Sequence, residues 1–196
     1  MRNRGLSKEE VAETALRLVD DGGLPDFTMR RLAAALGVQP SAIYWYYPNK
    51  QSLLAELADR IIASSRHGVH EGEWTGLLRA EAVAVREALL AYRDGAEIVT
   101  STMALGLGSD LGTARLVEAL RSSPLAPETT RQAAATMLHF ILGHVSLEQQ
   151  RMTYDSVGAR GGRPAMLLDH SRSDGFCFGV ETIISGLEAR VGSTNR

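Results

Sequence analysis

Residues 28–50 read TMRRLAAALGVQPSAIYWYYPNK, and their spacing predicts two short helices joined by a tight turn. Thr28 is a good N-cap, because its hydroxyl can accept a hydrogen bond from a free backbone N–H of the first turn. The apolar residues that follow it recur at helical spacing, at Met29, Leu32, Ala33 and Leu36. Gly37 is expected to end this helix, since glycine adopts the left-handed C′ conformation without steric cost.

The second predicted helix begins near Pro40, where the missing proline N–H is no loss. Two helices joined by a short turn that contains glycine form a helix-turn-helix. The second helix of such a unit enters the major groove of DNA by its N-terminal residues. We therefore predict a DNA-contacting surface, with operator DNA as the partner, made of Arg30, Gln39, Pro40, Ser41, Ala42, Tyr44, Trp45, Tyr46 and Lys50.

Gln39 and Ala42 have side chains suited to bases, because an amide can hydrogen-bond a base edge and a methyl group can pack on thymine. The aromatic residues 44–46 and Lys50 are placed to meet phosphates and sugars, which position a protein without reading sequence. Ile43 is expected to face inward. The alternative is that the aromatic residues form a small hydrophobic core, since at least one of four consecutive helical residues must face inward.

The composition indicates a globular chain, because 196 residues with 44% hydrophobic and 22% charged side chains can bury a sizeable core. The net charge is only −2, so the DNA prediction rests on the motif and not on bulk charge. Arg2 and Arg4 precede the first helix, where they could form a minor-groove arm or a solvated tail.

The single cysteine, Cys177, excludes an intrachain disulfide and a cysteine metal cluster. It is expected to pack as a small hydrophobic residue. The sequence shows no signal peptide and no apolar run of about 18 residues. We therefore expect a cytoplasmic protein with no membrane partner.

No segment shows the alternation of a strand, and the chain is predicted to be all-α. The first helix should open at Ser7 and run to Gly22. A helix from Asn49 to about residue 66 should connect the helix-turn-helix to the rest of the chain. Further helices are predicted at 75–92, ended by Gly95, at 111–120, at 128–152, and at 174–191 with Asp174 as its cap, after a glycine-rich connection over 153–173.

These elements divide into a helix-turn-helix domain of residues 1–50, a connecting helix of residues 49–66, and a C-terminal domain of residues 67–196. The last two helices are more apolar than a monomer of this size needs. Paired with a twofold copy they would form a four-helix bundle, so we expect a homodimer. Two DNA-binding helices held about 34–36 Å apart could read a palindrome. A ligand that changed this distance would weaken DNA binding.

The chain resembles the TetR family of bacterial repressors, and within it the tetracycline repressor subclass. The resemblance implies an N-terminal three-helix DNA-binding domain, a helical ligand-binding and dimerisation domain, and release from the operator by a small-molecule inducer. The motifs that carry it include Phe27-Thr28-Met29-Arg30-Arg31-Leu32-Ala33, Leu36-Gly37-Val38, Ile43-Tyr44, Asn49-Lys50, Tyr92-Arg93-Asp94-Gly95-Ala96, Leu147-Glu148-Gln149-Gln150 and Ile184-Ser185-Gly186-Leu187-Glu188.

The resemblance also implies an inducer cavity enclosed by helices between about residues 75 and 150, with polar groups set in an apolar wall. The candidates are His67, Glu81, Val85, Arg86, Tyr92, Val99, Thr100, Thr102, Met103, His139, His144, Glu148 and Gln149.

One departure from the tetracycline repressor subclass concerns the metal. That subclass holds its drug as a magnesium chelate through a histidine at the position that is Val99 here, and valine cannot coordinate a metal. We therefore expect no metal and no cofactor, and a moderately apolar ligand. His144 and Glu148, four residues apart on one helix face, could bind a metal in principle, whereas the alternative is a helix pair packed at the dimer interface.

Two other functional classes compete with a ligand-responsive repressor. A constitutive, dimeric DNA-binding protein would need no ligand cavity. A helical enzyme is the other alternative, but the chain has no glycine-rich phosphate loop after a strand and no GxSxG motif, so we predict that it is not an enzyme.

Overall fold

The computed structural model describes residues 6–65, 72–108, 110–156 and 169–194, and within these ranges it contains helices and no strand. This confirms the predicted all-α fold class. The helices are α1 (Lys8–Gly22), α2 (Met29–Leu36), α3 (Pro40–Tyr44), α4 (Lys50–Ala63), α5 (Trp74–Leu90), α6 (Gly95–Ala104), α7 (Leu111–Ala119), α8 (Pro127–Ser156) and α9 (Asp169–Thr194).

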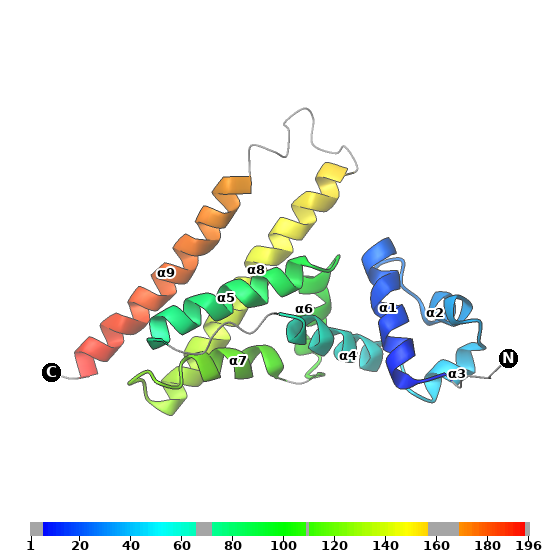
Figure 1. Cartoon of the computed structure of the whole chain (residues 1–196), viewed down its shortest axis with the longest axis horizontal. Coiled ribbons are helices and arrows are strands. Elements are labelled where there is room, and N and C mark those ends of the chain that lie inside the picture. Colours follow the sequence, from blue (N-terminus) through cyan, green and yellow to red (C-terminus); the bar gives the residue numbers. More distant parts are fainter. Residues whose placement is uncertain (1–5, 66–71, 109, 157–168, 195–196) are drawn as a thin grey trace.

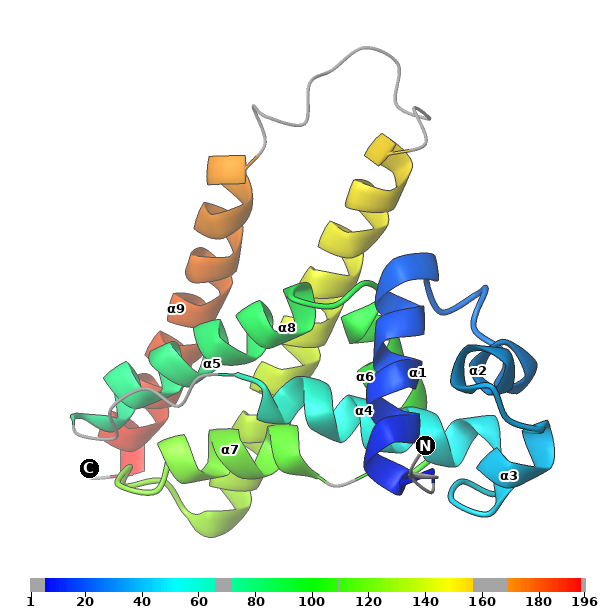
Figure 2. The same cartoon turned by 45° about the vertical axis from the view of Figure 1, so that its right-hand side comes forward.

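The helices form two groups, which we call the head (α1–α3) and the body (α5–α9). Figure 1 shows the head at one end of the molecule and α4 running from it into the body. Helix α4 packs on α1 in the head and on α5, α6 and α7 in the body. Helix α9 packs on α5 and α8 and forms the side of the body remote from the head, as Figure 2 also shows.

Helices α1, α2 and α4 begin at the caps that the sequence predicts, and α2 ends at Gly37 as predicted. The hydroxyl of Ser7 accepts from the backbone N–H of Glu10, and that of Thr28 accepts from Arg31, each at 3.1 Å. Gly37 has a φ of 67°, so glycine suits this helix end. Asn49 caps α4 in a capping box. The buried side chains that join α1, α2, α3 and α4 include Val11, Leu32, Ile43, Leu53 and Leu57.

Three predictions about helix ends are wrong. Helix α3 ends at Tyr44, so the remaining aromatic residues lie beyond it. Helix α5 ends at Leu90, and Gly95 is instead the first residue of α6. A Cβ at Gly95 would lie 2.3 Å from the carbonyl oxygen of Leu89, so glycine is needed here for a close approach of two helices. Asp174 lies inside α9, which begins at Asp169.

Helix α9 has two apolar faces. Phe176, Val180, Ile184 and Leu187 form an apolar stripe at helical spacing, and all four are buried against the rest of the body. Phe178 is 75% exposed, and Cys177 is exposed too, so within the single chain Cys177 does not pack as a small hydrophobic residue, contrary to our expectation. Large exposed side chains also occur on α8, at Leu147, Met152 and Tyr154. In the part of the chain described, no helix is long and apolar enough to cross a membrane.

Candidate functional site

The N-terminal half of α3 faces solvent. Pro40 occupies the first turn, and Ile43 is fully buried, as predicted, which fixes the rotation of the helix on the head core. Gln39 and Ser41 are exposed, and Pro40 and Ala42 are half-buried. Arg30 of α2 is exposed, as are Tyr44 and Trp45, at 48% and 89%. The structure therefore brings most of the predicted DNA-contacting residues to the surface of the head.

The next two aromatic residues, Tyr46 and Tyr47, make hydrogen bonds within the head. The hydroxyl of Tyr46 donates to the carbonyl oxygen of Leu6, and that of Tyr47 donates to the carbonyl oxygen of Lys8 at 3.4 Å. Tyr47 is 2% exposed, and desolvation by this burial raises the pKa of its phenol to about 12. The interpretation of the aromatic residues as core is therefore correct for Tyr47, whereas Tyr46 is half-buried.

Lys50 is also engaged within the head. Its ammonium group donates to the carbonyl oxygen of Phe27 at 2.8 Å and lies 5.4 Å from the centre of the Phe27 ring. The side chain is half-buried. Lys50 therefore ties the start of α4 to the start of α2, in addition to the contact with DNA phosphates that we predict for it.

Arg60 of α4 joins the head to α4. Its guanidinium donates to the carboxylate of Glu9 on α1 at 2.5 and 2.7 Å, and to that of Glu56 at 2.9 Å. The hydrogen bond from Arg60 holds the pKa of Glu9 below its usual value. Because Glu9 is exposed, solvent screens this pair, and its main effect is to fix the geometry between α1 and α4.

A second link joins the head to the turn between α5 and α6. Asp94 has a φ of 57°, an uncommon value for a residue other than glycine. Its carboxylate accepts from the backbone N–H of Leu24 at 2.8 Å. The carboxylate of Asp20 accepts from the backbone N–H of Arg93 at 2.9 Å. Two carboxylates, one from the head and one from the body, thus hold the C-terminal end of α1 on the body.

Gln149 of α8 supports the same turn from the other side. Its amide oxygen accepts from the N–H of Ala96 at 3.1 Å. Its amide nitrogen donates to the carbonyl oxygens of Leu89 and Tyr92 at 2.9 and 2.8 Å. All these hydrogen bonds of the side-chain amide go to the backbone, and Gln149 is therefore a structural residue of the turn, although it was a candidate for the ligand pocket.

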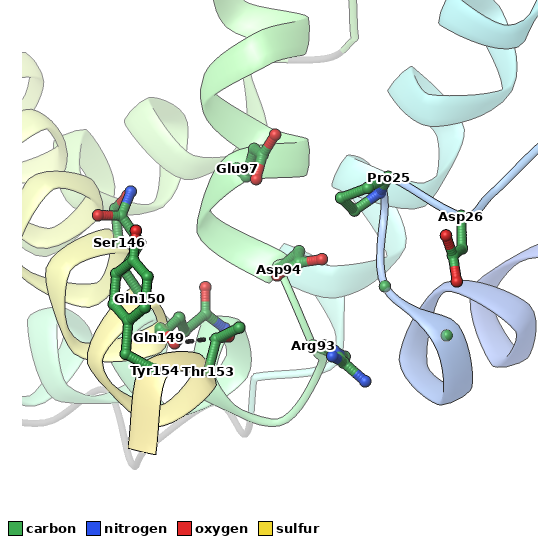
Figure 3. Close-up of a pocket in the computed structure, with 12 residues that line it drawn as sticks. Pro25, Asp26, Arg93, Asp94, Glu97, Ser146, Gln149, Gln150, Thr153 and Tyr154 are labelled. Atoms are coloured by element: carbon green, nitrogen blue, oxygen red, sulfur yellow. Dashed lines mark hydrogen bonds between the residues drawn. The ribbon is translucent and has the colours of Figure 1, made fainter. Parts of the chain in front are cut away.

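An open groove of about 320 Å³ lies between the head and the body. Figure 3 shows its walls: Pro25 and Asp26 come from the α1–α2 connection, Asp94 and Glu97 from α6 and its N-cap, and Ser146, Gln149, Gln150, Thr153 and Tyr154 from α8. The groove could not be predicted from the sequence, because its two walls are far apart in the chain. The only sequence signal was the Arg93–Ala96 motif.

The interior of the body contains two ion pairs. Glu81 of α5 pairs with Arg115 of α7 at 2.5 Å, and Arg86 of α5 pairs with Glu148 of α8 at 2.8 Å. All four side chains are at most 15% exposed. The guanidinium of Arg86 also lies 5.2 Å from the centre of the Phe176 ring. The structure thus buries Glu81, Arg86 and Glu148 inside the body, and their contact with a ligand stays a prediction. Arg115 was not among the predicted residues.

The other candidate pocket residues have different surroundings within the part of the chain that the structure describes. Val99, Thr102 and Met103 line a small pocket of about 20 Å³ together with Ile62 and Leu138. Val85 is fully buried core, and Tyr92 is half-buried. His144 packs against the rings of Phe140 and Phe176, while Thr100 and His139 are exposed. His67 lies outside the described residues.

The residues do not fit a magnesium chelate of the kind that the resemblance suggested. Val99 presents methyl groups, and both carboxylate oxygens of Glu148 already accept from Arg86, at 2.8 and 2.9 Å. Among the residues that the structure describes, no group of three or more His, Cys, Asp and Glu side chains could hold a metal ion.

Two family models match the chain. "Bacterial regulatory proteins, tetR family" matches residues 11–57, and "Tetracyclin repressor-like, C-terminal domain" matches residues 69–171. The chain is also 32% identical over 206 residues to the tetracycline repressor protein class D of Escherichia coli, covering 95% of this chain and 91% of that one. The chain belongs to the tetR family of bacterial regulatory proteins. These relatives are transcriptional regulators and not enzymes.

Solved structures of the family share the fold described above. BioQ from Mycobacterium smegmatis is 34% identical, covers 94% of this chain and 99% of its own, and superposes with a TM-score of 0.84. A BioQ structure with its natural double-stranded DNA operator is 31% identical, with the same coverage and a TM-score of 0.75. A single-residue variant of TetR from Acinetobacter baumannii AYE, in complex with minocycline, is 29% identical, covers 94% of this chain and 98% of its own, and has a TM-score of 0.77.

Proposed function

We propose that this chain is a ligand-responsive transcriptional repressor that binds a palindromic operator as a homodimer and leaves it when a small-molecule inducer binds. The observation that carries the proposal is the exposed N-terminal half of α3, on a head that α4 connects to a separate helical body. The family supports it, because BioQ is solved with its DNA operator and the Acinetobacter TetR variant with minocycline.

In this proposal residues 1–50 form the DNA-binding domain, α4 connects it, and residues 67–196 bind the ligand and form the dimer. Gln39, Ser41 and Ala42 face the bases. Arg30, Tyr44, Trp45, Tyr46 and Lys50 meet the phosphates and sugars beside them. The protein acts in the cytoplasm, where its operator is.

The second apolar faces of α8 and α9 support the homodimer. Leu147, Met152 and Phe178 are exposed in the single chain, at 57%, 46% and 75%. A second copy of the chain, related by a twofold axis, would cover them in a four-helix bundle. The dimer then holds two heads at the spacing of successive major-groove faces, about 34–36 Å.

The body interior indicates what kind of ligand it would take. Three buried guanidinium nitrogens make no hydrogen bond among the described residues: Arg86 Nε, Arg115 Nη2 and Arg115 Nε, of which only the last lies in the ion pair with Glu81. A buried donor without an acceptor is costly, so a ligand with acceptor oxygens on an apolar skeleton would gain most here. Ligand binding would shift the dimer away from the conformation in which the distance between its two heads fits DNA.

The test is a binding-site selection with the full-length protein and random duplex DNA. We expect enrichment of a palindrome whose half-sites are about 10 base pairs apart, centre to centre. Enrichment of a single half-site would contradict binding of the operator by a dimer. No enrichment at all would contradict sequence-specific DNA binding. A screen of small molecules for release of the selected duplex then separates a ligand-responsive repressor from a constitutive DNA-binding protein.

A further inference from the structure

Arg115 of α7 is buried in the body, with 7% of its side chain exposed. Its Nε lies 2.5 Å from Oε1 of Glu81 on α5, and the Glu81 side chain is 9% exposed. An isolated charge in such a place would be very costly, and the carboxylate neutralises it. Charge pairing alone would therefore explain why both side chains can be buried.

The same guanidinium has a second attachment that charge pairing does not require. Nη1 of Arg115 donates to the carbonyl oxygen of Ile62 at 2.9 Å and also to the hydroxyl oxygen of Ser65. The hydroxyl of Ser65 in turn donates to the Ile62 carbonyl at 2.9 Å. Ile62 belongs to the last turn of α4, where carbonyls have no partner within the helix and carry partial negative charge. The Ile62 carbonyl also accepts from the backbone N–H of Ser65, just beyond the helix, at 3.3 Å. Arg115 thus holds the C-terminal end of α4.

Helix α4 transmits a displacement of its C-terminal end to the head. It has 14 residues, so it is about 21 Å long and behaves as one rigid element. Leu53 and Leu57 are fully buried in the core where α4 meets the head, and Arg60 pairs with Glu9 of α1. A small displacement of the end held by Arg115 therefore reorients the whole head.

We propose that Arg115 is a positioning residue for DNA binding: its guanidinium fixes the C-terminal end of α4 and thereby the orientation of the head. The proposal rests on the proposed function, because head orientation matters for a dimer that reads two half-sites. This role needs the guanidinium group of an arginine, because its Nε lies against Glu81 while its Nη1 binds the end of α4. The single ammonium group of a lysine cannot reach both.

The test replaces both charges by apolar residues of similar size, as Glu81→Leu with Arg115→Met. Such a replacement of a buried ion pair is often neutral for stability, yet here it removes both hydrogen bonds to α4. Three quantities are measured: the thermal midpoint, the affinity for the selected operator, and the distance between the two heads. The distance comes from electron spin resonance with labels at Glu13→Cys, an exposed site on α1, in a Cys177→Ser background.

We expect the double variant to keep its dimeric state and thermal midpoint, to lose about tenfold or more in operator affinity, and to show a shifted or broader distribution of head distances. Operator affinity within about threefold of the wild type, with an unchanged distance distribution, would overturn the proposal and leave the pair a core-filling element. Arg115→Lys serves as the matched variant that keeps the positive charge, and we expect it to behave like the double variant.

If the double variant does not fold, Ser65→Ala tests the same proposal. It keeps the Glu81–Arg115 pair and removes one of the two attachments to α4, so we expect a loss of about two- to fivefold in operator affinity and a broader distance distribution. Wild-type values for both would overturn the proposal. A failure of the proposed function is distinguishable, because the wild type would then select no DNA while the head distances still responded to Arg115.

Discussion

At the C-terminal end of α3, four consecutive aromatic side chains point in two directions. Tyr44 and Trp45 face solvent, while Tyr46 and Tyr47 reach back to the backbone of Leu6 and Lys8. The division arises because α3 ends at Tyr44 and the chain turns there. The first pair is thus free to contact DNA. The hydroxyls of the second pair hold the head together, and half-buried Tyr46 does so in addition to the DNA contact that we propose for it.

Tyr44→Ala should weaken operator binding without changing the dimer. The exposed ring and hydroxyl lie beside the α3 residues that we expect to face the bases, and their loss should cost about 1–3 kcal/mol, or roughly ten- to a hundredfold in affinity. A fluorescence anisotropy titration with the selected operator measures this. Gln51→Ala, an exposed change on α4, is the matched control. Wild-type affinity of Tyr44→Ala would contradict our placement of the DNA-binding surface.

Tyr47 should make the head unstable in alkali. In the unfolded chain its phenol loses the proton near the ordinary pKa of 10.0, whereas burial raises the pKa in the fold to about 12. The stability that Tyr47 contributes is therefore complete below pH 10 and is lost as the pH rises towards 12. Tyr47→Phe should reduce this loss, measured by chemical denaturation at several pH values. An identical pH dependence in the variant would contradict the assignment.

At the scale of elements, the turn between α5 and α6 shows why helix ends were hard to predict. Gly95 looked like a helix terminator because glycine often follows a helix. It is instead the first residue of α6, required because Leu89 approaches it closely. The end of α1 and the amide of Gln149 hold this turn from opposite sides, and both are far away in the sequence.

Asp94→Gly should loosen the contact between head and body. Glycine accepts the φ of 57° without strain, so the change removes only the carboxylate that accepts from Leu24. We expect faster hydrogen exchange over residues 20–25, measured by mass spectrometry, with exchange in α8 unchanged. Asp94→Asn keeps an acceptor oxygen and should exchange more slowly than Asp94→Gly. Equal protection in all three proteins would show that this bond does not hold the head.

At the scale of the whole molecule, dimerisation and DNA reading are linked. The exposed apolar side chains Leu147 and Phe178 lie on α8 and α9 of the body, so changes there alter the assembly and not the DNA-contacting surface of the head. A monomer would keep an intact α3 but could read only one half-site, and its affinity would fall accordingly.

Leu147→Asp with Phe178→Glu should convert the dimer to a monomer. Burying two carboxylates per chain in an apolar bundle is unfavourable, whereas both sites are exposed in the single chain, so the fold should persist. Light scattering after size-exclusion chromatography measures the mass, and circular dichroism checks helicity. Operator affinity should fall by about a hundredfold or more, because the second half-site is lost. A dimeric variant would contradict the proposed interface.

The sequence by itself determined the helix-turn-helix, its caps at Thr28, Gly37 and Asn49, the burial of Ile43 and the apolar stripe of α9, because caps and helical periodicity are local properties of the chain. Only the tertiary structure decided which polar groups meet. It paired Glu81 with Arg115 and Glu148 with Arg86, joined Arg115 to the end of α4, and set Asp94 against Leu24. These contacts join helices that are distant in sequence, and their partners are chosen by packing, which leaves no local pattern in the chain.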